Sequence, residues 1–174
     1  MRKILAAAAV AALAVGLSAQ EPKKGTPEAM MKEGMFTAKF PGEAKTHTQS
    51  AAGITLHATL SENGKEKGAY TVIYTDLPGD KLKATTPAQV LESGVAGLRT
   101  NFSAEVTESK AAEFGPKKYP AREVAAERKE TGFHLRGKVV LAGNRLYQVY
   151  VIGPKDFVTT KEADGFLGSF AVTD

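Results

Sequence analysis

The feature that most constrains the fold of this chain is a predicted β-hairpin between Thr131 and Pro154. Two apolar runs flank Gly143 and Asn144, and a two-residue connection of this composition supplies the positive-φ conformations of a tight hairpin turn. Because Gly137 would face Tyr150, its missing side chain leaves room for the tyrosine ring to lie across the neighbouring strand. The turn also fixes the other predicted cross-strand pairs: Ala142 with Arg145, Leu141 with Leu146, Val139 with Gln148, and Leu135 with Ile152.

The second strand of this hairpin, residues 145–152, is apolar on both faces. Side chains alternate along a strand, so one face of the hairpin combines Phe133, Leu135, Val139, Leu141, Leu146, Tyr150 and Ile152 with the polar Gln148. On the other face, Tyr147, Val149 and Val151 are predicted to be covered, whereas His134, Arg136 and Lys138 are predicted to be solvated. A strand that is apolar on both faces is typical of a sheet interior. We therefore expect this strand to be central and helices to cover the sheet.

The first 19 residues have the pattern of a secretory signal peptide. Arg2 and Lys3 give a positive start, residues 4–17 form an apolar run too short for a comfortable membrane span, and Ala19 suits signal peptidase. The alternative is an uncleaved N-terminal anchor. The chain is expected to be exported, to the periplasm or out of the cell, with no transmembrane segment after cleavage.

The rest of the chain is expected to hold a flexible tether, residues 20–34, and a single domain, residues 35–174, long enough to bury its own core. The formal net charge of +4 falls to +2 without Arg2 and Lys3, so no nucleic-acid partner is expected. The chain has no cysteine, which excludes disulfides, a lipid anchor through cysteine and thiol catalysis.

Alternating apolar residues and turn signals predict the remaining strands. Residues 106–114 and 123–129 have few large apolar groups, which favours positions towards a sheet edge. The register of the hairpin in residues 44–60 depends on whether its loop has two or three residues. The predicted strands outside the central hairpin are 35–40, 44–50, 54–60, 69–75, 106–114, 123–129 and 171–173.

Two helices are predicted from capping signals and apolar spacing. The first begins after Thr86, with Pro87 in the first helical position and Gln89 as capping-box partner. Gly94 and Gly97 lie inside it and are expected to allow close approach to the sheet. Its buried stripe is Leu91, Val95, Leu98 and Phe102. The second helix is capped by Thr159 or Thr160 and buries Ala163, Phe166, Leu167 and Phe170. The predicted fold class is α+β, a mainly antiparallel sheet packed by two main helices.

Three stretches together resemble a known family. They are Phe40-Pro41-Gly42, residues 70–78 (YTVIYTDLP), and the ending that combines residues 145–149 (RLYQV) with 166–170 (FLGSF). These stretches resemble secreted bacterial proteins of unknown function with a PsbP-like α/β/α sandwich. The resemblance covers about residues 35–174 and implies the fold. PsbP proteins are extrinsic subunits of the photosynthetic oxygen-evolving complex, but no residue of this chain carries that role over.

Three groups of residues are candidates for a functional site. His47 and His57 would face each other across a three-residue loop at 51–53 and could begin a metal site, whereas a two-residue loop puts them on opposite faces as solvated residues. Tyr70, Tyr74, Tyr147 and Tyr150 are candidates for lining an apolar ligand pocket, with core packing as the alternative. Lys117, Lys118, Tyr119 and Arg122 form a predicted loop that could dock an anionic partner, with a solvated connection as the alternative.

The sequence contains no convergent catalytic set. Residues 132–139 approach a phosphate-binding loop, but Val139 replaces the required Ser or Thr and a strand follows. Asn101 heads a glycosylation motif inside a predicted helix and is discounted. No catalytic residue and no cofactor are predicted. The predicted function is a non-catalytic binding module with an envelope protein partner; the alternatives are a carrier of a small apolar ligand and a metal-dependent enzyme that uses His47 and His57.

Overall fold

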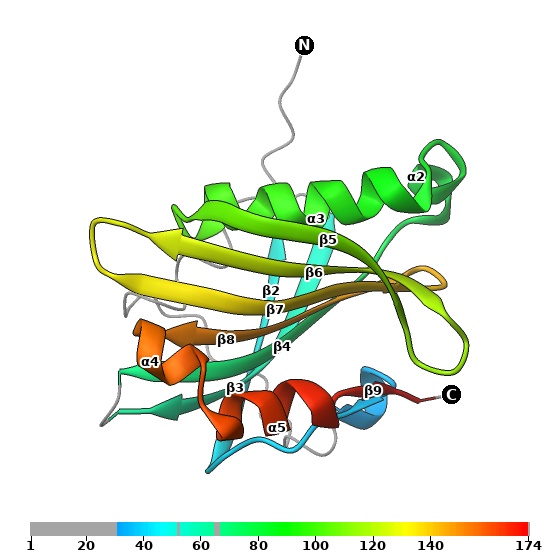
Figure 1. Ribbon diagram of the computed structural model, residues 1–174. Coiled ribbons are helices and arrows are strands. Elements are labelled where there is room, and N and C mark those ends of the chain that lie inside the picture. The colour runs from blue at the N-terminus through cyan, green and yellow to red at the C-terminus, as the bar shows by residue number, and fades with distance from the viewer. Residues whose placement is uncertain (1–30, 52, 65–66, 174) are drawn as a thin grey trace.

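A seven-stranded sheet forms the framework of the protein, in the order β2-β3-β4-β8-β7-β6-β5 (Figure 1). The computed structural model describes residues 31–51, 53–64 and 67–173, so the predicted signal peptide and the start of the tether lie outside the described residues. All neighbouring strands in the sheet are antiparallel. The strands are β2 (Ala44–Ala51), β3 (Ile54–Asn63), β4 (Gly68–Asp76), β5 (Glu105–Phe114), β6 (Tyr119–Arg128), β7 (Phe133–Ala142) and β8 (Arg145–Gly153).

Strand β8 is central, as the apolar pattern predicted. It is the fourth of seven strands, and Tyr147, Val149, Tyr150 and Val151 are at most 1% exposed. The register of the β7–β8 hairpin matches every predicted cross-strand pair. A Cβ atom on Gly137 would overlap the carbonyl oxygen of Val149 and the ring of Tyr150. The sequence-based explanation of Gly137 is therefore confirmed.

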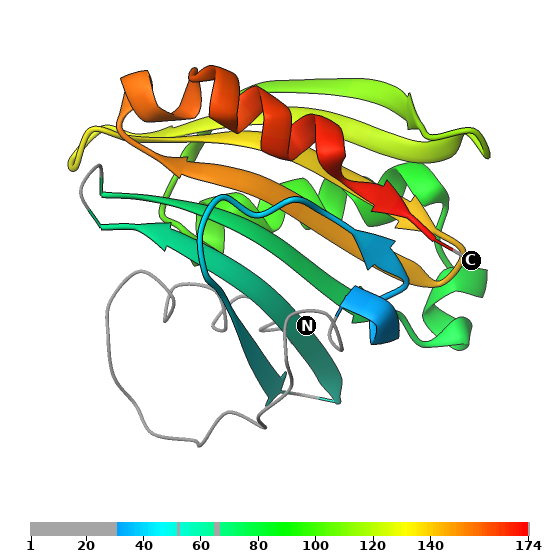
Figure 2. The same ribbon diagram turned by 90° about the horizontal axis from the view of Figure 1, so that it is seen from below.

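The two main helices lie on opposite faces of the sheet (Figure 1, Figure 2). Helix α3 (Pro87–Asn101) packs on β5, β6 and β7, and α5 (Lys161–Ser169) packs on β8 from the other side. These faces are called the α3 side and the α5 side below. The short helices are α2 (Gly79–Lys83) and α4 (Lys155–Val158), and a separate two-stranded sheet pairs β1 (Phe36–Thr37) with β9 (Ala171–Val172).

Local capping signals determine where the main helices begin. Thr86 and Gln89 form the predicted capping box, with the Gln89 backbone N–H donating to Thr86 Oγ1 at 3.3 Å and the Thr86 N–H donating to Gln89 Oε1 at 2.8 Å. Thr160 caps α5 by accepting a hydrogen bond from Ala163 N at 3.1 Å. Of the two threonines considered from sequence, Thr160 is therefore the cap.

Each face of the sheet has its own core. The α5 side is aromatic, because Tyr70, Tyr74 and Tyr147 pack with rings from β1, α4 and α5. The α3 side is mainly aliphatic and combines the apolar stripe of α3 with β6, β7 and β8. Helix α3 does not extend over β3 and β4, and the pocket described below lies at this uncovered corner.

Some sequence-based expectations are wrong. The predicted strand at 35–40 shortens to Phe36–Thr37. Strand β6 begins at Tyr119 and includes Pro120, because proline is tolerated near the start of a strand. The predicted loop at 117–122 is therefore a short turn followed by strand.

The polar face of β7 is half-buried rather than solvated, since α5 crosses it. Arg136 Nη2 donates to Asp164 Oδ1 at 2.6 Å, and Lys138 Nζ donates to the Leu167 carbonyl oxygen at 3.1 Å. Burial lowers the pKa of Lys138 from its ordinary value. His134 is half-buried on the same strand. The position of a helix far along the chain thus decides the exposure of this face.

Candidate ligand-binding pocket

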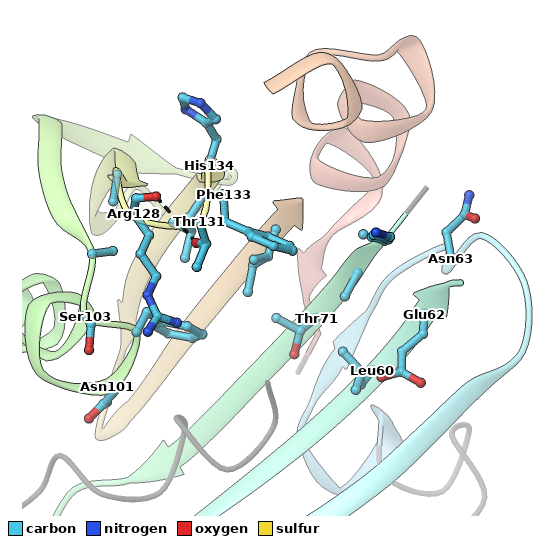
Figure 3. A pocket seen from close by; sticks show the side chains of 18 of the residues that line it. Leu60, Glu62, Asn63, Thr71, Asn101, Ser103, Arg128, Thr131, Phe133 and His134 are labelled. Carbon is cyan, nitrogen blue, oxygen red and sulfur yellow. Dashed lines mark hydrogen bonds between the residues drawn. The ribbon is translucent and has the colours of Figure 1, made fainter. Parts of the chain in front are cut away.

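A pocket of about 660 Å³ opens on the α3 side, beside the C-terminal end of α3 (Figure 3). This volume is in the range of natural small-molecule sites. Five strands and the segment after α3 contribute to its wall. The lining includes Leu60 and Glu62 of β3, Ala69, Thr71 and Ile73 of β4, Ile152 of β8, Phe133 and Leu135 of β7, Arg128 of β6, and Asn101 at the end of α3.

The end of α3 creates the open corner. The N–H of Phe102 donates to the Leu98 carbonyl oxygen at 3.0 Å and closes the last turn of the helix. Ser103 then adopts a positive φ of 50°, which turns the chain away towards β5. Phe102 packs edge-on against Tyr150, with ring centroids 6.3 Å apart. The helix therefore stops at β8. Beyond it, Phe102 packs on Ala58 and Ile73, whereas other α3-side residues of β3 and β4, such as Leu60 and Ala69, line the pocket.

The floor of the pocket is apolar because of strand alternation. Leu60 is paired with Thr71, and Ala58 with Ile73, so these side chains of β3 and β4 all point to the α3 side. Leu60 is 8% and Ile73 1% exposed. Ile152 and Leu135 continue this floor across β8 and β7. Concave apolar surface with a few polar groups at its margin is the usual composition of a ligand site.

Two polar side chains at one end of the pocket have unsatisfied atoms. Asn101 is 8% exposed, and within the described residues neither its Oδ1 atom nor Nε of Arg128 has a hydrogen-bond partner. In Figure 3 the Arg128 side chain extends from the end of β6 towards Ser103 and Asn101. An unsatisfied buried polar atom costs about 1–3 kcal/mol. These groups mark the polar end of the pocket.

The four tyrosines considered from sequence do not meet in one cavity. Tyr70, Tyr74 and Tyr147 point to the α5 side, whereas Tyr150 points to the α3 side. All four are at most 1% exposed, and none lines the pocket. Burial raises the pKa of Tyr150 above its usual range, and burial with nearby Glu33 raises that of Tyr74 to about 12. Their placement corresponds to the core-packing alternative.

The residues of the predicted anion-docking loop face in different directions. Lys118 lies in the turn and pairs with Glu113 at 3.5 Å, and Lys117 is an exposed turn residue. Tyr119 packs on the α5-side core, whereas Arg122 points to the α3 side, with Nη2 donating to Glu92 Oε1 at 3.0 Å. The four side chains therefore do not form one continuous surface.

His47 and His57 lie on opposite faces of the β2–β3 hairpin. The register pairs His47 with Ala58 and Thr48 with His57, which is the two-residue-loop alternative. The ring of His57 stacks on Tyr74 at 4.6 Å between centroids. The two imidazoles of one chain thus cannot share an ion. Within the described part of the chain, no group of three or more His, Cys, Asp or Glu side chains is placed to hold a metal.

A second polar cluster lies at the other end of β8, on the α5 side. Arg145 Nε and Nη2 each donate to a carboxylate oxygen of Asp76 at 2.7 Å, and its guanidinium lies 4.8 Å from the Tyr74 ring centroid. Arg145 also donates to the Glu33 carbonyl oxygen at 2.9 Å, and Tyr147 Oη donates to that of Gly34 at 2.7 Å. This cluster fastens the segment before β1 to the sheet and is structural.

No local sequence pattern pointed to the pocket residues. One signal for them existed: a single 15-residue helix cannot cover one face of a sheet seven strands wide, whose neighbours are about 4.8 Å apart. Some apolar residues of that face had to remain uncovered. Which strands remain uncovered depends on where α3 crosses the sheet, and the position of this crossing cannot be predicted from a local sequence pattern.

The fold and the pocket define an α+β sandwich with a seven-stranded antiparallel sheet, two main helices and an apolar pocket at one corner. A solved structure with a similar fold is the solution structure of cyanobacterial PsbP (CyanoP) from Synechocystis sp. PCC 6803. It is similar to this chain with a TM-score of 0.53 and 16% sequence identity, over 91% of this chain and 95% of that one. The fold is therefore PsbP-like, as the sequence resemblance implied.

This likeness concerns the fold alone. No protein-family model and no curated protein matches the sequence. Among the described residues, no helix is long and apolar enough to cross a membrane.

Proposed function

We propose that this protein is an exported, non-catalytic binding module that holds a small, mainly apolar ligand in the pocket beside α3. The observation that carries the proposal is the pocket itself, about 660 Å³ with a floor of buried aliphatic side chains. Burying apolar ligand surface contributes about 25 cal/mol per Å², so such a floor favours an apolar occupant. The signal-peptide pattern of the first 19 residues supports export.

A pocket-filling substitution tests the location of binding. Ala69 is half-buried and lines the pocket, so Ala69→Trp would occupy space that the ligand needs. Ala111→Trp is the matched control, because Ala111 is exposed on β5. Binding of the neutral fluorescent probe N-phenylnaphthylamine is expected to be lost in the first variant and kept in the second. Circular dichroism checks that both variants fold.

Native mass spectrometry tests whether a ligand is bound in the cell. The protein purified gently from its own source is expected to carry a small molecule that Ala69→Trp does not carry. If the probe binds both tryptophan variants equally, or if neither the probe nor any co-purifying molecule binds the unaltered protein, the proposed function is wrong. Cell fractionation and sequencing of the mature N-terminus test export, with Gln20 as the expected first residue.

A further inference from the structure

The pocket has one charged end that the described residues do not neutralise. Arg128 is half-buried there, and its guanidinium forms no ion pair with any residue in the described ranges. Its Nε atom is buried without a hydrogen-bond partner among them, as is Oδ1 of Asn101. By contrast, Arg122 on the same strand is paired with Glu92, and Arg136 on β7 is paired with Asp164. Arg128 therefore lines the pocket as a cation without an ion-pair partner among the described residues.

The pocket extends across the sheet from this charged end. Its lining residues run from Arg128 on β6 across β7, β8 and β4 to Leu60 on β3. Four steps between neighbouring strands of about 4.8 Å give a length of about 19 Å. Glu62 and Lys67 lie at the far end, where both are exposed and carry opposite charges. One end is thus cationic, and the other is open to solvent with no net charge from this pair.

We propose that the occupant is a fatty acid, with its carboxylate on Arg128 and its acyl chain along the apolar floor towards Leu60. This inference rests on the proposed function and adds the chemical class of the ligand. A guanidinium pairs with a carboxylate through two parallel hydrogen bonds, and one arginine matches one negative charge. The Oδ1 atom of Asn101, which has no partner among the described residues, is an acceptor, as is the carboxylate, so Arg128 alone is assigned to the head group. Isoleucine and leucine side chains of β8, β4 and β3 contact the acyl chain.

Isothermal titration calorimetry of the full secreted chain with amphiphiles of one chain length tests the inference. Dodecanoate, dodecanol, dodecyl phosphate and dodecylammonium differ only in the head group and are used below their micelle-forming concentrations. Dodecanoate is expected to bind at least about tenfold more tightly than the other three. A hydrogen bond to a charged group is worth about 1.5–3 kcal/mol, which corresponds to about 10- to 100-fold in affinity.

Substitution of the arginine identifies the contact. In Arg128→Gln, dodecanoate affinity is expected to fall about 10- to 100-fold, while dodecanol affinity is unchanged. Arg128→Lys keeps the charge without the two parallel bonds and is expected to retain part of the preference; it also serves if the glutamine variant does not fold. Arg122→Gln is the matched control on the same strand and face, and is expected to bind like the unaltered protein.

The outcomes separate this inference from the proposed function. If all four amphiphiles bind equally, or if dodecyl phosphate or dodecylammonium binds most tightly, the fatty-acid inference is wrong while the binding function stands. Loss of dodecanol affinity together with dodecanoate affinity in Arg128→Gln also contradicts the inference. If none of the amphiphiles binds and the neutral probe does not bind, the proposed function fails as well.

Discussion

Helix α3 contains two glycines, three residues apart, that have different surroundings. A Cβ atom on Gly94 would lie 3.1 Å from Val139 Cγ1 and 3.4 Å from Leu146 Cδ2, both buried side chains of the central hairpin. A Cβ atom on Gly97 would meet only the Asn101 side chain, at an ordinary 3.5 Å. The expectation that both glycines permit close approach to the sheet therefore holds for Gly94 and is wrong for Gly97.

Replacing each glycine by alanine separates helix propensity from packing. In a helix interior, alanine is more favourable than glycine by about 1 kcal/mol. Gly97→Ala is expected to gain this amount, because nothing has to move. Gly94→Ala gains the same propensity but crowds the core, which typically costs about 1–3 kcal/mol. The free energy of unfolding of the two variants is therefore expected to differ by about 2 kcal/mol, with Gly97→Ala the more stable.

Urea unfolding followed by circular dichroism measures this difference. The slope of the free energy with urea should be the same in both variants, since neither changes the surface exposed on unfolding. In thermal unfolding, Gly97→Ala is expected to raise Tm by about 3 °C. If Gly94→Ala stabilises the protein as much as Gly97→Ala does, then α3 is not packed tightly on the central hairpin. The position of α3 on the sheet would then not account for the open corner at which the pocket lies.

Three further predictions concern the central strands. Gly137→Ala is expected to destabilise the protein by more than about 3 kcal/mol, since the backbone of β8 must move to admit the methyl group. If urea unfolding shows a decrease in the free energy of unfolding of less than about 1 kcal/mol, then β7 and β8 can shift apart at little cost. Tyr147→Phe removes the hydrogen bond to Gly34 and is expected to lower the free energy of unfolding by about 1–2 kcal/mol. It should also speed amide hydrogen exchange in residues 33–37. Unchanged exchange would show that this hydrogen bond does not hold the segment before β1 on the sheet. The hydrogen bond from Arg145 holds the pKa of Asp76 below its usual value. The unaltered protein is therefore expected to be more stable than Asp76→Asn by the full amount at pH 7. This difference in the free energy of unfolding should be lost as the pH falls below about 4 and Asp76 becomes protonated in the native state. An advantage that stays constant down to low pH would contradict the ion pair.

Features set by neighbours in the sequence were predicted correctly. The Gly143-Asn144 turn fixed the register of β7 and β8, because a two-residue loop allows one pairing of the residues that flank it. The capping box at Thr86 was found because its partners lie within one helical turn. The central place of β8 followed from apolar residues on both of its faces. Each of these signals is contained in a stretch of about 25 residues or fewer.

Features that depend on distant segments were not predicted. Lys138 looked solvated because the groups that contact it, α5 and the Phe114 ring, lie more than twenty residues away along the chain. The sequence left open whether the four tyrosines line a pocket or pack in the core, because an aromatic strand pattern is the same in both. The register of β2 and β3 remained open because Ala51 and Gly53 fit loops of either length.

By itself, the sequence determined the elements of this protein: a central hairpin with its register, two capped helices, and an antiparallel sheet between them. Only the tertiary structure decided where each helix crosses the sheet, and with it which side chains are covered. The pocket is the consequence of that placement. Asn101, Arg128 and Leu60 meet around it from three segments separated by dozens of residues. Alternation and capping act over a few residues, whereas a cavity exists only where packed elements fail to cover one another.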